Sequence, residues 1–249
     1  MVVDRNAEHC TVHRVNRGIF QIFSLLRSRE DLEYDKMEII MKNNSVNIDI
    51  DQANAFLRDK DPVEIIVWAL TRSQSPILTT NFGPFSSSLI HAVNSVKKDI
   101  KVIWCDTGYN TPHTYRYAHE IIQRFELNMH IYTPKSTAGF RDVTTGIPQI
   151  DSLEHKIFTD EVKLEPFRRA LSDHRPDIWF TNLRSDQSEF RSSLDILHVD
   201  KNGVIKVSPF FYYSEFEMEL YLQEYALPNE KKYYDPTKVL AKRECGLHL

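Results

Sequence analysis

The 249-residue sequence has few cysteines and no long apolar run. Cys10, Cys105 and Cys245 are too few and too scattered for a disulfide framework, which favours a reducing compartment. Three thiols also cannot supply the thiolate ligands of a cysteine-bound iron–sulfur cluster. The apolar stretch at 19–26 is far shorter than the ~20 residues that span a bilayer, and the polar first residues do not resemble a signal peptide. We therefore expect a cytoplasmic protein with no membrane attachment and no metal.

Neither sign of charge dominates, because 35 acidic residues stand against 31 basic ones. This balance argues against nucleic acid as a partner, although one local anion-binding pocket remains compatible with it. Internal repeats and low-complexity linkers are also absent. We expect an α/β domain at residues 46–232, an N-terminal extension at 1–45 and a C-terminal tail at 233–249. The extension could form an amphipathic helix or arise from an upstream start codon.

Short buried strands alternate with helices along the central part of the chain. The pattern predicts strands at residues 76–81, 100–105, 129–132, 178–181 and 204–207, and helices at 86–96 and 112–125. Two earlier helices are predicted, one capped by Asp51 and one that follows Pro62. This alternation predicts an α/β fold with a parallel sheet and right-handed crossovers. Ligands of such sheets bind beyond the carboxyl ends of the strands.

The first strand ends in a polar loop, Thr79, Thr80, Asn81, Phe82 and Gly83, just before a predicted helix. Backbone N–H groups and the positive end of that helix could bind an anion such as a phosphate. An ordinary strand-to-helix turn with serine caps is the alternative, since a single glycine is weak evidence for a phosphate loop.

The second strand ends in Asp106, Thr107 and Gly108. The carboxylate could bind a ribose or an adenine amino group. Equally, Asp-Thr-Gly is favourable turn chemistry, and both interpretations stay open.

The fourth strand is followed by Arg184, Gln187 and Arg191. Two arginines at this position could bind phosphate or sulfonate oxygens in a bidentate manner. The alternative is a solvated surface on which Asp186 and Glu189 are the ion-pair partners.

Cys245 lies near the C-terminus among Lys242, Arg243 and His248. Positive neighbours favour the thiolate, which is the nucleophilic form of cysteine. Most single cysteines are small buried hydrophobes or idle thiols, and Cys105 and Cys10 are assigned to that class.

Taken together, these segments resemble the phosphoadenosine phosphosulfate (PAPS) reductases. The loop at 79–83 is similar to the family's Ser/Thr-rich Phe-Gly loop, and residues 106–109 with Pro112, Thr114, Tyr115 and Arg116 resemble its Asp-Thr-Gly-Tyr segment. The arginine group resembles Arg-x-x-Gln-Ser-x-x-Arg, and residues 242–248 are nearly identical to the family's catalytic tail. Lys163 to Pro166 stand where adenylyl-sulfate reductases carry a cysteine pair for a cluster.

The resemblance implies a five- to six-stranded, mostly parallel sheet with helices on both faces, of the adenine nucleotide α-hydrolase-like type. It implies reduction of PAPS to sulfite in assimilatory sulfate reduction, no iron–sulfur cluster, a thioredoxin or glutaredoxin as electron donor, and a homodimer. Cys245 would be the catalytic residue. The substrate-binding residues would be Thr79, Thr80, Asn81, Phe82, Gly83, Asp106, Thr107, Gly108, Arg184, Gln187, Arg191, Lys242, Arg243 and His248.

Two other functions compete with this interpretation. The Gly-Asp-x-His segment that precedes the family's tail is missing, which would suit a non-catalytic, nucleotide-binding paralogue. An ATP pyrophosphatase would require Ser-Gly-Gly-x-Asp-Ser, and Pro84 removes one of the amide donors that such a loop uses.

Overall fold

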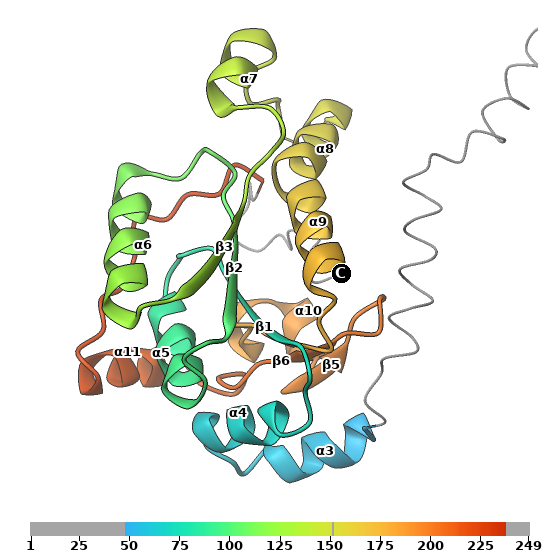
Figure 1. The fold of residues 1–249 in the computed structure, drawn as a ribbon, viewed down its shortest axis with the longest axis vertical. Coiled ribbons are helices and arrows are strands. Elements are labelled where there is room, and N and C mark those ends of the chain that lie inside the picture. Colours follow the sequence, from blue (N-terminus) through green and yellow to red (C-terminus); the bar gives the residue numbers. More distant parts are fainter. Residues whose placement is uncertain (1–47, 151, 238–249) are drawn as a thin grey trace, which may run out of the picture. The chain divides into compact units, whose positions relative to one another are not determined.

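The computed structural model describes residues 48–150 and 152–237, which contain a six-stranded sheet of order β3-β2-β1-β4-β6-β5 (Figure 1). Five strands run parallel, and β5 runs antiparallel to β6. The predicted mostly parallel sheet is therefore confirmed. The strands are β1 (Pro76–Thr80), β2 (Lys101–Cys105), β3 (Asn128–Tyr132), β4 (Ile178–Phe180), β5 (Leu197–Val199) and β6 (Ile205–Val207).

Helices flank the sheet on two sides, with α5 and α6 on one side and α8 and α9 on the other (Figure 1). None of the helices in the described part of the chain combines the length and the apolar character that a bilayer span needs. The helices are α3 (Ile50–Leu57), α4 (Pro62–Leu70), α5 (Ser86–Val96), α6 (Pro112–Phe125), α7 (Ala138–Thr144), α8 (Leu153–Thr159), α9 (Glu165–His174), α10 (Glu189–Ser192) and α11 (Glu215–Glu224).

The core forms where the central strands are covered on both faces, so that these strands are continuous apolar runs. All three residues of β4 are buried. Helix α6 contributes Thr114, Tyr117, Ala118 and Ile121, which share one face by their spacing of three and four residues. The loop after β1 adds Phe82, whose ring makes an edge-to-face contact with Trp104 at a centroid distance of 4.9 Å.

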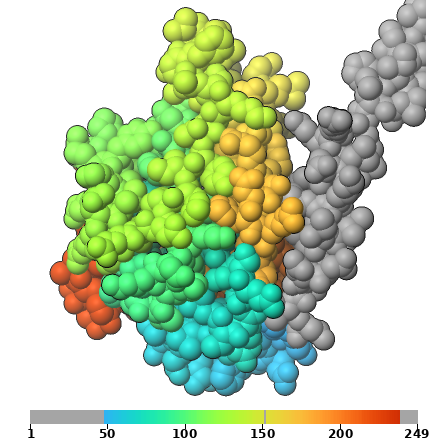
Figure 2. Space-filling model, in the orientation of Figure 1, coloured from blue at the N-terminus to red at the C-terminus, as the bar shows by residue number. Residues whose placement is uncertain are grey.

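Helix α7 projects away from the sheet (Figures 1 and 2). It exposes Phe140 and Val143, but its Arg141 is only 4% exposed. The Arg141 guanidinium donates to the carbonyl of Thr107, at 3.2 Å, and to that of Ser136, at 2.5 Å. Arg141 therefore attaches α7 to the loop after β2.

Two local predictions were wrong. Asp49, rather than Asp51, caps α3, because its side chain accepts the backbone N–H of Gln52 at 3.0 Å. Asp51 lies in the first helical turn, where a carboxylate also interacts favourably with the helix dipole. The strand predicted at 204–207 is the sixth rather than the fifth along the chain, because the three-residue strand β5 precedes it.

Asn54 of α3 hydrogen-bonds the backbone of Leu197 at the outer edge of β5. Its Nδ2 donates to the carbonyl of Leu197 at 2.9 Å, and its Oδ1 accepts the N–H of Leu197 at 2.8 Å. The side-chain amide thus takes the place of a further strand, and it leaves no open hydrogen-bonding edge at Leu197.

We expect Asn54→Ala to lower the free energy of unfolding by about 2–4 kcal/mol, because it leaves two buried backbone groups unpaired. Urea denaturation followed by circular dichroism measures the change. Gln52→Ala, on the exposed side of the same helix, is the control and should have a much smaller effect. Equal effects of the two substitutions would contradict this role for Asn54.

Candidate functional site

The strand order reverses between β1 and β4. From β1 the chain proceeds through α5 to β2 and through α6 to β3, and it then returns to pair β4 with the other edge of β1. In sheets of this kind the crevice that receives a ligand opens at the carboxyl ends of the two strands at the reversal. The loop after β1 and the loop after β4 are in contact, since Asn182 Nδ2 donates to the carbonyl of Phe85 at 2.9 Å.

The loop after β1 pairs its own amide groups. Every backbone N–H from residue 82 to 88, apart from Pro84, has an acceptor within the protein. The acceptors are Thr80 Oγ1 for Phe82 and Asn81 Oδ1 for Gly83 (both 3.0 Å), Asn229 Oδ1 for Phe85 (2.9 Å), Gly83 O for Ser86 (3.1 Å), and Tyr117 OH for Ser87 and Phe85 O for Ser88 (both 3.2 Å). A phosphate could therefore bind these amides only by displacing a protein acceptor.

The side chains of this loop are also largely engaged. Thr79 Oγ1 accepts the indole N–H of Trp179 at 2.7 Å. Phe82 is fully buried, so only its backbone could meet a ligand. Asn81 is exposed and lies beside Gly83, where an added Cβ would come within 3.1 Å of Asn81 Oδ1 and 3.3 Å of the Tyr233 ring. The close approach of these two side chains explains the glycine.

The loop after β2 is an Asp-Thr-Gly turn. The Asp106 carboxylate accepts from Gly108 N at 2.9 Å, from Asn110 Nδ2 at 2.8 Å and from the Tyr115 hydroxyl at 3.0 Å. Burial and the negative charge of Asp106 raise the pKa of Tyr115 to about 12, so its hydroxyl remains a donor. Gly108 has a φ of +81°, and Thr107 is buried. The turn chemistry that the sequence allowed is present.

The loop after β4 brings the predicted arginines together through Gln187. Gln187 Oε1 accepts the backbone N–H of Arg184 at 3.1 Å and a guanidinium N–H of Arg191. Arg184 Nε also pairs with Asp186 at 3.2 Å. Arg184 and Arg191 are only 4% and 9% exposed, so the alternative of a solvated charged surface does not fit. The guanidinium of Arg184 lies 5.0 Å from the Phe85 ring centroid, next to the β1 loop.

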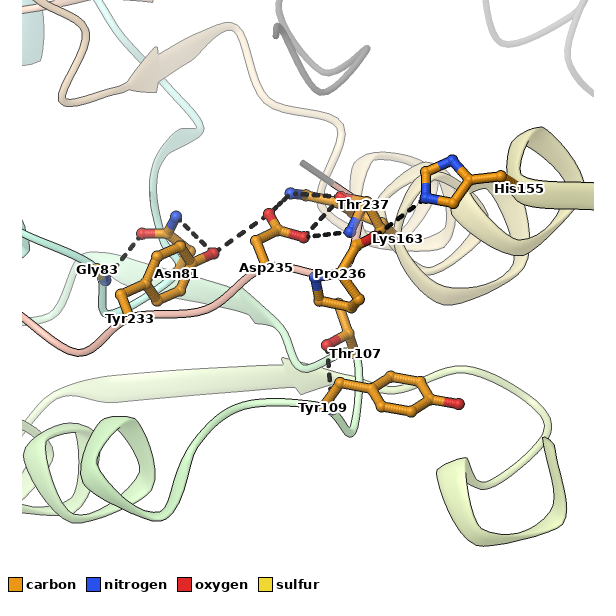
Figure 3. A network of polar contacts seen from close by, with 10 residues as sticks. All are labelled: Asn81, Gly83, Thr107, Tyr109, His155, Lys163, Tyr233, Asp235, Pro236 and Thr237. Carbon is orange, nitrogen blue, oxygen red and sulfur yellow. Dashed lines mark hydrogen bonds and ion pairs between the residues drawn. The ribbon is translucent and has the colours of Figure 1, made fainter. Parts of the chain in front are cut away.

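A third segment at this edge, Tyr233–Thr237, was not among the predicted binding residues (Figure 3). The buried Lys163 and Asp235 form an ion pair, and Tyr233 OH accepts from Asn81 Nδ2 at 2.9 Å. Burial alone would raise the pKa of Asp235. The positive charge of Lys163 and the hydrogen bonds that Lys163 and Thr237 donate to the carboxylate outweigh burial, so the pKa of Asp235 lies below its usual value. The predicted residues Lys242, Arg243, Cys245 and His248 follow this segment and lie outside the described residues.

Cys105, at the end of β2, is not an activated thiol. Burial raises its pKa to about 12, despite the opposing effect of Lys163 and Arg169. Within residues 48–150 and 152–237, no group of three or more His, Cys, Asp or Glu side chains could hold a metal ion.

Similarity to known proteins identifies the family. The phosphoadenosine phosphosulfate reductase domain model matches residues 75–235. A phosphoadenosine 5′-phosphosulfate reductase of Aliivibrio salmonicida is 31% identical over 249 residues, which cover 90% of this chain and 94% of the relative. The chain belongs to the phosphoadenosine phosphosulfate reductase family. A second PAPS reductase, of Vibrio cholerae, is 32% identical over 221 residues and covers 79% of this chain and 87% of its own.

Solved structures confirm the fold that the family resemblance implied. The PAPS reductase of Candida auris, solved as a phosphate complex, has a TM-score of 0.66 and 24% identity, with coverage of 76% of this chain and 92% of that chain. The U34-tRNA thiolase NcsA of Methanococcus maripaludis has a TM-score of 0.50 and 14% identity, and the match covers 72% of this chain and 67% of that chain. The described part of the chain thus shares with these proteins the fold of a mostly parallel sheet flanked by helices.

We expect Cys105 to resist alkylation by iodoacetamide in the folded protein at pH 8. With a pKa of about 12, only about one thiol in ten thousand is ionised, whereas an ordinary cysteine is about one quarter ionised. Peptide mapping by mass spectrometry should show labelling at least about a thousandfold slower than in the urea-unfolded chain. Comparable rates in the two states would contradict the raised pKa.

Proposed function

We propose that this chain reduces PAPS to sulfite and adenosine 3′,5′-bisphosphate in assimilatory sulfate reduction. The observation that carries the proposal is the pair of buried arginines, Arg184 and Arg191, at the strand reversal of a chain that belongs to the PAPS reductase family. Planar guanidinium groups suit phosphate and sulfate oxygens, because they can donate two parallel hydrogen bonds.

In the proposed mechanism the Cys245 thiolate attacks the sulfur of the sulfuryl group. An S–S bond forms as the bond between sulfur and the phosphate oxygen breaks, and the bisphosphate leaves. One thiolate of a reduced thioredoxin or glutaredoxin then attacks Cys245 Sγ and expels sulfite. The second thiolate of that dithiol resolves the mixed disulfide and restores Cys245. The two electrons come from the dithiol, so no metal cofactor is required.

The position of the last described residues supports this role for Cys245. Thr237 is buried next to Lys163 and Asp235, four residues after Tyr233, which contacts the β1 loop, and Cys245 follows Thr237 by eight residues. Eight extended residues span at most about 28 Å. A tail of this length, starting at the edge of the crevice, suits a nucleophile that must reach both a nucleotide and a protein reductant.

The remaining predicted contacts belong to the same proposal. Asn81 is the exposed polar side chain of the β1 loop, and Asp106 with Thr107 and Gly108 would face the nucleoside from the neighbouring strand end. Thr79, Thr80 and Phe82 already have protein partners or are buried, so they would support the loop or contribute backbone atoms. A cytoplasmic homodimer remains the expected form of the enzyme.

Reduced thioredoxin and PAPS should yield sulfite with the native chain and none with Cys245→Ser, since a serine hydroxyl stays protonated at neutral pH. Sulfite release measured with a thiol-reactive dye tests this. Without the reductant, intact mass should show one SO₃ group added to the native chain and none to the variant. Sulfite from Cys245→Ser would overturn the mechanism. Binding of PAPS by the native chain without turnover would instead support the non-catalytic paralogue.

Arg184→Ala and Arg191→Ala should each weaken the binding of adenosine 3′,5′-bisphosphate by roughly 1.5–3 kcal/mol if they donate to charged oxygens. Isothermal titration calorimetry measures this loss. Lys98→Ala is the control, because Lys98 is exposed before the amino end of β2, at the opposite end of the sheet. Unchanged affinity in both arginine variants would remove these residues from the binding site.

A further inference from the structure

The segment Tyr233–Thr237, here called the anchor, is the last described part of the chain before Cys245. Building on the proposed function, we infer that Lys163, Asp235 and Tyr233 are positioning residues that fix the start of the cysteine-bearing tail beside the crevice. They would act through the location of the anchor and without touching the nucleotide.

The contact between Lys163 and Asp235 is enclosed by the protein. The two side chains are 7% and 3% exposed. Asp235 Oδ1 also accepts from the backbone N–H of Thr237 at 3.0 Å and from its hydroxyl at 2.6 Å, and Lys163 Nζ lies 3.3 Å from Thr237 Oγ1. A buried ion pair adds little net stability compared with an apolar pair, but it strongly disfavours arrangements in which either charge loses its partner. Such a pair suits one defined docking position of the anchor.

Lys163 occupies an unusual backbone conformation. Residues Asp160–Leu164 form a π-helical turn between α8 and α9, and the N–H of Glu165 donates to the carbonyl of Asp160, five residues earlier. Such turns are rare, and they frequently occur at functional sites. From α8, His155 Nε2 lies 3.1 Å from the carbonyl oxygen of Pro236. Two successive helical segments therefore hold the anchor.

The anchor also contacts the loop after β1 directly (Figure 3). The Tyr233 hydroxyl donates to Asp235 Oδ2 at 3.3 Å and accepts from Asn81 Nδ2 at 2.9 Å. Asn81 Oδ1 in turn accepts the backbone N–H of Gly83 at 3.0 Å. A continuous set of hydrogen bonds thus extends from Lys163 to the loop after β1.

The anchor determines the length of the tether that carries Cys245. Eight residues separate Thr237 from Cys245. If the anchor is released, the next hydrogen bond to the β1 loop upstream is that of Asn229 to Phe85, which is sixteen residues from Cys245. Effective concentration falls roughly as the −3/2 power of tether length, so this doubling lowers it about threefold. Loss of the defined starting direction would lower it further.

Disulfide formation measures this effective concentration without any substrate. In a chain carrying Cys10→Ser and Cys105→Ser, Asp186→Cys places one thiol beside Arg184. Its equilibrium with Cys245 in a glutathione buffer gives an effective molarity. We expect Asp235→Asn and Tyr233→Phe to lower that value at least about threefold. Tyr234→Phe, which changes the exposed neighbouring tyrosine, is the matched control and should leave it unchanged.

Two outcomes would overturn the proposal. One is an unchanged effective molarity in both anchor variants, and the other is failure of the parent chain to form the disulfide. If circular dichroism shows that Asp235→Asn unfolds, Thr237→Val takes its place, because it retains both charges and removes only the hydroxyl. An effective molarity lowered by Tyr233→Phe and Thr237→Val would then support the anchor.

Turnover provides the second measurement. If the anchor only positions the tail, Tyr233→Phe should lower kcat for sulfite release about threefold or more and leave KM for PAPS unchanged. A raised KM with unchanged kcat would mean that Tyr233 contacts the nucleotide, and this would overturn the positioning role. If the native chain releases no sulfite while the anchor variants still lower the effective molarity, the proposed function is wrong. The positioning role of the anchor is then still supported.

Discussion

The pairing of β4 with β1 is the constraint on which the candidate site depends. Ile77 of β1 is matched to Lys101 of β2 on one side and to Trp179 of β4 on the other. The connections from these strands therefore leave in opposite directions, and in such sheets ligands bind between the loops that follow the two strands. The hydrogen bond from Asn182 to Phe85 then ties the two loops together. The location of the site is thus a consequence of topology, and side-chain chemistry only decides what the site can bind.

Elements with local signals could be predicted from the sequence, whereas elements that depend on distant partners could not. Helix α6 begins and ends where predicted, because Thr111 caps it and proline occupies its first position, where the missing N–H has no cost. Strand β5 has only three residues, and its edge is satisfied by Asn54 from α3. No periodicity in so short a segment could reveal it. Helices α7, α8 and α9 were not predicted either.

Within the candidate site, too, contacts between residues close in sequence could be predicted and contacts between distant residues could not. Arg184, Gln187 and Arg191 lie three and four residues apart, so a local turn is enough to bring them together, and their spacing was visible in the sequence. Lys163 and Asp235 are separated by 72 residues. Nothing in either neighbourhood indicates the other, since a lysine and an aspartate in isolation are most often solvated surface residues. Only the fold shows that both are buried, and burial is what makes their contact specific.

 The positions of two cysteines, Cys105 at the end of β2 and Cys245 near the C-terminus, explain why only the second is proposed to react. Cys105 is fixed at the end of β2, where burial raises its pKa to about 12 and keeps the thiol protonated. A thiol held inside a strand could serve one bound partner at most, because it cannot move away from the sheet. The proposed reaction requires two encounters, first with a nucleotide and then with a protein dithiol. In the proposal a tail that begins at the anchor meets both requirements, because Cys245 follows Thr237 by only eight residues and these can span at most about 28 Å. In this proposal Lys163 and Asp235 contribute to turnover by positioning the tail, and the arginines contribute by binding the nucleotide. Neither Lys163 nor Asp235 has to touch the substrate.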